Sequence, residues 1–157
     1  MIKRRIGNKG DISAQEIEKA YRKAFNVPLV NIIKRIVLKV FGLNSLSLPF
    51  LFADNCYKTA SFHIIKQILK ETKEKFGCWV YKEEEADCDD ATFWLMGVFH
   101  QDPRTVGMPI YITWVGTPEG GHAILSFYFS GTVYIIEPQD YTTFFVPKDW
   151  KLWALIG

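Results

Sequence analysis

A thiol, an imidazole and a carboxylate occur in an order that could support covalent chemistry. Cys88 opens an apolar-periodic run and is predicted to begin a helix, whereas His122 opens one predicted strand and Glu137 closes the next. Unpaired backbone N–H groups and the helix dipole favour a thiolate at a helix N-terminus. Because an imidazole can accept the thiol proton and a carboxylate can orient the imidazole, these residues predict a nucleophile, a base and an orienting acid.

The predicted hairpin between His122 and Glu137 decides whether their side chains meet. A two-residue loop at Ser130–Gly131 places His122 opposite Gln139, with Glu137 as a neighbour within reach. A three-residue loop would bring Asp140 to the histidine and turn Glu137 away. We therefore expect Glu137 as the third member and Asp140 as the reserve, with Gln139 orienting the imidazole or binding substrate.

Several alternatives stay open around this arrangement. Cys56, expected in the first turn of another helix, is a second candidate nucleophile, although a buried structural role is commoner there. The backbone N–H of Cys88 is one candidate oxyanion donor, and Trp79 or Asn55 is open as the second. The three chemical groups can also be unrelated, and the chain would then be a non-catalytic binding or structural module.

The composition indicates one globular domain. A chain of 157 residues suits a single domain, and its 48% hydrophobic content is enough for a core. The formal net charge of +2 does not indicate nucleic acid as a partner. No uninterrupted apolar run reaches about 18 residues, so we expect no integral membrane segment. The three cysteines and the lack of a secretory segment predict a cytoplasmic protein without a disulfide framework.

The hydrophobic periodicity changes from helical to strand-like along the chain. A helix is predicted to start after Ser13, a later one to begin near Asp54 or Asn55 and to end at Gly77, and period-two alternation begins at Pro109. We therefore expect a single α+β domain over residues 1–157, in which N-terminal helices pack on an antiparallel sheet from the C-terminal half.

Residues 1–50 are expected to form a helical extension of this domain. Apolar positions over residues 29–41 form a wide face that basic side chains interrupt. A core-facing helix is the commoner outcome for such a pattern. A membrane-surface role for residues 28–53 is the alternative.

Three motifs resemble a known superfamily. Asp87-Cys88-Asp89-Asp90, Gly121-His122-Ala123 and Ile136-Glu137-Pro138-Gln139 are similar to motifs of the papain-like and transglutaminase-like cysteine peptidases. Within that superfamily the similarity is greatest to the papain-like C-terminal domain of a mushroom agglutinin and to related phage and bacterial proteins. The resemblance covers about residues 54–140, and Ala91-Thr92 departs from the aromatic-Ala pair of many relatives.

The resemblance implies a papain-like or transglutaminase-like fold and a thiol protease with a Cys88–His122–Glu137 triad. Such an enzyme would hydrolyse an amide bond of a peptide or protein substrate through an acyl-thioester, with acyl transfer to an amine as a close variant. The resemblance also implies a calcium ion, for which Asp87, Asp89 and Asp90 are the candidate ligands. The alternative role of these carboxylates is a helix cap with two further anions at a helix N-terminus.

Overall fold

The computed structural model describes residues 12–25, 50–82 and 86–157. The basic start of the chain, the helix expected over residues 29–41 and most of the stretch 28–53 lie outside these described residues. Within the described ranges, no helix combines the length and the apolar character needed to cross a bilayer.

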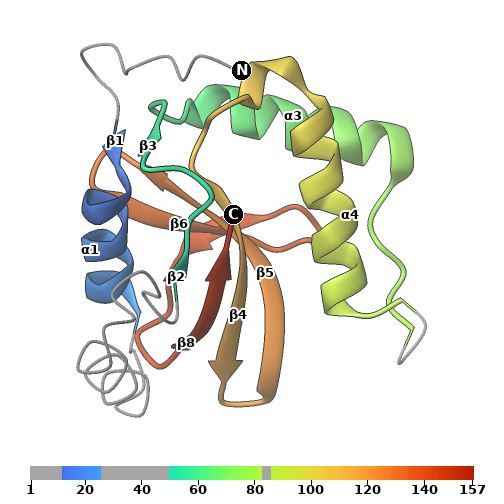
Figure 1. Cartoon of the computed structure of the whole chain (residues 1–157). Helices are drawn as coiled ribbons and strands as arrows, with labels where there is room; N and C mark the ends of the chain where they lie inside the picture. The colour runs from blue at the N-terminus through green and yellow to red at the C-terminus, as the bar shows by residue number, and fades with distance from the viewer. Residues whose placement is uncertain (1–11, 26–49, 83–85) are drawn as a thin grey trace.

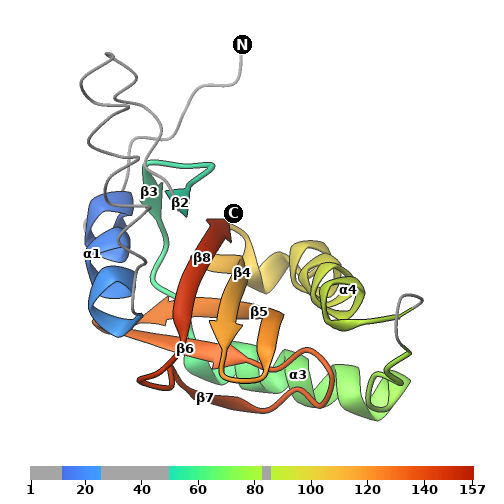
Figure 2. The same cartoon turned by 90° about the horizontal axis from the view of Figure 1, so that it is seen from below.

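A six-stranded mixed sheet organises the described chain (Figures 1 and 2). The strand order is β2-β8-β4-β5-β6-β7. Neighbours are antiparallel except at one edge, where β2 pairs in parallel with β8. The strands are β2 (Phe50–Leu51), β4 (Ile110–Thr117), β5 (Gly120–Phe129), β6 (Thr132–Ile136), β7 (Thr143–Phe145) and β8 (Lys151–Ile156).

Helices cover both faces of this sheet. Helix α1 (Ala14–Ala24) lies on one face, and helices α3 (Phe62–Phe76) and α4 (Cys88–Gln101) lie on the other (Figure 2). Consecutive residues of β5 therefore enter different cores: Ile124 packs in the core under α1, and Leu125 packs in the core under α3 and α4. Because both faces are covered, most of β5 is buried and its sequence reads as a nearly continuous apolar run.

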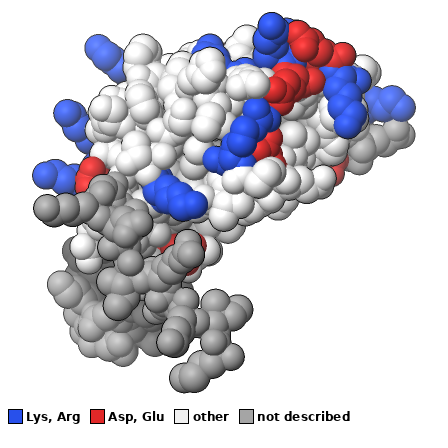
Figure 3. Space-filling view, turned by 90° about the horizontal axis from the view of Figure 1, so that it is seen from above, with Lys and Arg blue, Asp and Glu red and all other residues white. Residues whose placement is uncertain are grey.

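Charged side chains of both signs gather over the outer face of α3 (Figure 3). Its inner face carries Ile65, Ile68 and Leu69, which are buried at helical spacing. Gly77, at φ +74°, ends the helix as the sequence predicts, because glycine adopts this left-handed backbone without steric cost.

The predicted start of α3 is wrong. The helix begins after Ser61, whose hydroxyl accepts the Ile64 N–H at 3.4 Å, and not at Asp54 or Asn55. Residues Cys56–Tyr57 instead form β3, which pairs with β1 (Ile12–Ser13) in a separate two-stranded sheet. This pairing joins segments that are far apart in the sequence, so no local sequence pattern predicts it.

The hairpin between β5 and β6 agrees with the two-residue loop. Ser130 and Gly131 both have positive φ, at +50° and +84°, as a type I′ turn requires. Phe129 pairs with Thr132, and the register continues to Leu125 opposite Ile136. Local turn chemistry therefore fixes this register.

The expected fold class is wrong. The described chain is built around a mixed sheet with three helices on its two faces, whereas the sequence predicted N-terminal helices packed on an antiparallel C-terminal sheet. Phe50–Leu51, from the half expected to be helical, adds the parallel edge strand. A two-residue strand carries no periodicity, so its long-range pairing with β8 decides the sheet class and not its local pattern.

Candidate functional site

The first residue of α4 lies beside the start of β5. Asp87 caps the helix as predicted, and its carboxylate accepts the Asp89 N–H at 3.2 Å. The Ala123 N–H donates a hydrogen bond to Cys88 Sγ at 3.4 Å. Since Ala123 directly follows His122, packing of α4 on the sheet brings the cysteine motif against the histidine motif.

His122 and Glu137 form a hydrogen-bonded pair next to this thiol. The imidazole Nε2 lies 2.8 Å from Glu137 Oε2, and the two side chains are 21% and 20% exposed. The backbone N–H of Gln139 donates to Glu137 Oε1 at 3.3 Å. The Trp150 ring contacts the imidazole edge-on, with 6.2 Å between the ring centroids. We call Cys88, His122 and Glu137 the thiol cluster.

The other candidate residues differ in their distance from the thiol cluster. Asp140 accepts hydrogen bonds from Thr142 in its own turn, and Glu137 is the carboxylate on the imidazole. The Trp79 N–H donates to the Gln139 carbonyl at 2.8 Å, so Trp79 lies near the thiol cluster. Cys56 belongs to the β1–β3 sheet instead, where it is exposed and not in a helix, and the carbonyl of the preceding Asn55 accepts the Ala14 N–H.

The surroundings of Cys88 favour the neutral thiol. Partial burial raises the pKa of Cys88, the Ala123 N–H lowers it, and the charges of Asp87 and Asp89 raise it, with a net rise. Thiolate stabilisation expected from the helix N-terminus is therefore outweighed by desolvation and two adjacent carboxylates. At neutral pH the thiol keeps its proton.

The acidic motif makes an incomplete set of ligands for calcium. Ligand atoms of Asp87, Cys88 and Asp89 lie within 4.8 Å of one another, and Asp90 is not in this group. A hydrogen bond between the carboxyl groups lowers the pKa of Asp87 and raises that of Asp89. Calcium takes six to eight oxygen ligands, so two carboxylates and a soft thiol do not fit it by themselves. The calcium role stays a prediction.

The hydrophobic pattern of the sequence does not single out the exposed indole of Trp153. Trp153 in β8 is 49% exposed, and Gly116 and Gly121 lie beneath its ring. A Cβ built on Gly116 would lie 2.7, 2.8 and 2.9 Å from Cζ2, Cε2 and Nε1, and one on Gly121 would lie 2.9 Å from Cζ3. Three ring atoms at nearly equal distance indicate that the indole presents its face to the strands.

Gly116 and Gly121 are direct cross-strand partners, so together they make a flat floor for the ring. Any side chain at either position would displace the indole. We call Trp153 with these two glycines the aromatic platform. A glycine inside a predicted strand often marks the close approach of another group, and this signal was present in the sequence.

The aromatic surface continues from the platform toward α4. Trp114 lies two residues before Gly116 on the same face of β4, and its ring contacts Phe93 of α4 edge-on at 5.9 Å. Phe93 is 53% exposed. Gly121 and His122 are consecutive residues of β5, so the platform and the His122 side chain lie at the same end of the strand but on opposite faces of the sheet.

Comparison with known proteins finds solved structures that are similar in fold alone. No family model matches the sequence, and no curated protein matches it. One similar solved structure is described as the PSL1a–E64 complex, with a TM-score of 0.66, 16% identity, and coverage of 94% of this chain and 51% of that chain. Another is Polyporus squamosus lectin bound to the human-type influenza-binding epitope Neu5Acα2-6Galβ1-4GlcNAc, with a TM-score of 0.56 and 18% identity.

The chain shares its fold with part of each of these two structures. The second comparison covers 82% of this chain and 48% of the lectin chain, so this chain spans about half the length of either structure. The second description names a lectin, and neither description names a papain-like or transglutaminase-like peptidase. The superfamily expected from the three motifs, and the thiol protease and hydrolase activity inferred from it, are therefore corrected by these comparisons.

Proposed function

We propose that this chain is a non-catalytic binding module and that its ligand is a carbohydrate bound at the aromatic platform. The observation that carries the proposal is the Trp153 indole, which lies on Gly116 and Gly121 with its other face open to solvent. The shared fold with a lectin solved in complex with a glycan supports the same function.

The chemistry of a sugar ring suits this surface. One face of a pyranose carries C–H groups, which are weakly positive and pack against the negative face of an aromatic ring. The ring edge carries hydroxyl groups, which need hydrogen-bond partners when water is displaced. A flat aromatic surface with a polar border supplies both interactions.

Polar groups border the platform on two sides. Lys151 is exposed and pairs with Gly116 across the β4–β8 ladder, and Glu119 is exposed in the turn between β4 and β5. These groups are the candidate partners of the sugar hydroxyls.

The thiol cluster fits a binding role better than a nucleophilic one. A nucleophilic cysteine needs a depressed pKa, whereas burial and the two adjacent aspartates raise the pKa of Cys88. In this proposal the neutral thiol has a structural role, in which it accepts the Ala123 N–H and packs α4 against β5. The His122–Glu137 pair then acts as a fixed hydrogen-bonding unit.

A glycan array with the labelled full chain tests the proposal, followed by calorimetric titration of the bound glycans. We expect Trp153→Ala to weaken binding by about tenfold, since a buried aromatic anchor typically contributes more than about 1 kcal/mol. Phe145→Ala is the matched control, because Phe145 is an exposed aromatic residue on β7 at the opposite edge of the sheet. Absence of glycan binding by the folded wild type, or equal affinity of both variants, would overturn the proposal.

A further inference from the structure

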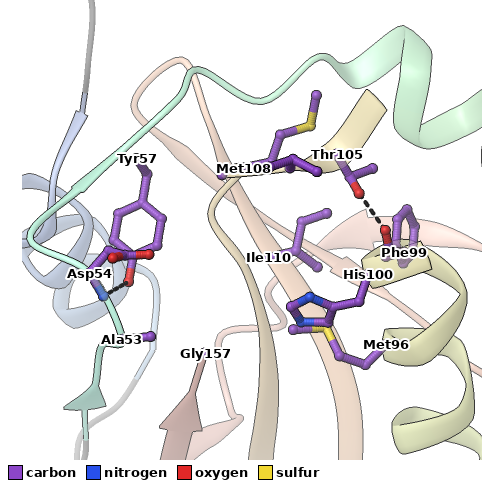
Figure 4. A pocket seen from close by; sticks show the side chains of 12 residues that line it. Ala53, Asp54, Tyr57, Met96, Phe99, His100, Thr105, Met108, Ile110 and Gly157 are labelled. Atoms are coloured by element: carbon purple, nitrogen blue, oxygen red, sulfur yellow. Dashed lines mark hydrogen bonds between the residues drawn. The ribbon is translucent and has the colours of Figure 1, made fainter. Parts of the chain in front are cut away.

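A pocket lies at the C-terminal end of α4, remote from the thiol cluster (Figure 4). Its walls come from α4, from the turn before β4 and from the segment between β2 and β3. Cys88 and His100 are at opposite ends of α4, so a rise of 1.5 Å per residue separates them by about 18 Å along the helix axis. The pocket is therefore a separate site.

Apolar side chains make most of the pocket wall. Met96 and Phe99 contribute from α4, Met108 from the turn before β4, and Ile110 from the first position of β4 (Figure 4). The cavity volume is about 180 Å³. An engineered cavity of about 150 Å³ in another protein binds benzene, so this pocket has room for one six-membered ring. A sugar ring is excluded by the same lining, because its hydroxyl groups would lose their hydrogen bonds.

One carboxylate gives the pocket its fixed charge. Asp54 and Tyr57 lie together on one side of the pocket, and the His100 ring lies on the other (Figure 4). The Asp54 backbone N–H donates to Tyr57 Oη at 3.2 Å, which holds the Asp54 backbone against a buried ring, while the Asp54 side chain is exposed. Asp54 makes no ion pair with any other residue described by the structure. Its charge is therefore available to a cationic ligand.

We propose that this pocket binds a small cyclic amine, with the ring between Met96 and Met108 and the ammonium group on Asp54. The apolar lining selects the ring, and the carboxylate selects its charge. This second ligand is chemically unlike a carbohydrate. The outcome of this proposal therefore does not depend on glycan binding at the platform.

The two methionines offer a direct readout of the pocket. The chain has three methionines, and two of them, Met96 and Met108, line the pocket. We would label the methionine methyl groups with carbon-13, assign them with Met96→Leu and Met108→Leu, and titrate benzylamine, benzyl alcohol and benzoate. We expect benzylamine to shift the two pocket signals in a saturable way, and benzoate to bind least.

Asp54→Asn tests the charge contact, with Asp149→Asn as an exposed matched control between β7 and β8. We expect Asp54→Asn to weaken benzylamine by about fivefold and to leave benzyl alcohol unchanged, because an exposed charge contact is worth about 1 kcal/mol or less. Unmoved signals of Met96 and Met108, or equal affinity for benzylamine and benzoate, would overturn the proposal. The ligand series on the wild type decides the outcome even if Asp54→Asn fails to fold.

Discussion

Two opposing electrostatic effects act on Cys88. The helix N-terminus and the Ala123 N–H favour the thiolate, whereas partial burial and the carboxylates of Asp87 and Asp89 favour the thiol. The second set prevails, so the pKa of Cys88 lies above its ordinary value. A cysteine at a helix start is therefore not sufficient for reactivity when acidic residues cap the same helix.

We expect Cys88 to react with iodoacetamide more slowly at neutral pH than the exposed Cys56 and Cys78, because Cys88 is partly buried and its pKa is raised. Mass spectrometry of each labelled cysteine across pH measures the three rates. Asp89→Asn should accelerate Cys88 by removing a nearby negative charge, whereas Asp140→Asn should not. Faster labelling of Cys88 than of Cys56 would contradict the raised pKa.

The same shift has a consequence for stability. The folded chain holds the Cys88 proton more tightly than the unfolded chain, so the unfolded state binds fewer protons as pH rises. The resulting stabilisation is complete below the unfolded pKa of the thiol. It is lost as pH rises through the higher folded pKa.

At the scale of elements, two glycines in different surroundings make a matched pair. A Cβ on Gly116 would collide with the Trp153 ring, whereas a Cβ on Gly97, inside α4, would meet no atom within 4 Å. Gly97 thus costs α4 helix propensity with no contact that requires a glycine. Gly116, by contrast, is needed because the Trp153 indole of β8 occupies the space of a side chain at this position of β4.

We expect Gly97→Ala to raise the free energy of unfolding by about 0.5–1 kcal/mol, because alanine restricts the unfolded chain and favours helix. Gly116→Ala should lower it by about 1–3 kcal/mol through overpacking, and should weaken glycan binding by tilting the ring. Urea unfolding and glycan titration of both variants measure these effects. If Gly116→Ala bound glycan as the wild type does, the indole would not need its glycine floor.

Elements also differ in how far sequence predicts them. The β5–β6 hairpin follows from Ser130–Gly131 and from alternation, since turn and register are local properties. The parallel pairing of Phe50–Leu51 with β8 could not be predicted, because it depends on contacts between distant segments. The hydrogen bond of His122 to Glu137 followed from the register, whereas the raised pKa of Cys88 depends on packing against β5.

For the whole molecule, the sheet separates two cores, and α1 closes one of them. Tyr21 is at the centre of that core. Its ring is fully buried and contacts the rings of Phe25, Phe50 and Tyr111. Its hydroxyl forms a hydrogen bond with the Ser126 hydroxyl at 2.7 Å. Three short motifs carried no information on this two-sided arrangement. The family inferred from them was wrong, although the motifs lie close together in the structure.

The Tyr21 side chain therefore tests whether α1 belongs to the folded unit. Tyr21→Phe keeps the ring and leaves Ser126 without this partner, so we expect a loss of about 1 kcal/mol. Tyr21→Ala also removes the ring from a closed core, which should cost about 3–5 kcal/mol, a large share of the 5–15 kcal/mol typical of a domain. Urea unfolding followed by tryptophan fluorescence measures both. Wild-type midpoints for both variants would mean that α1 is not packed on the sheet, and one face of it would then be open to solvent.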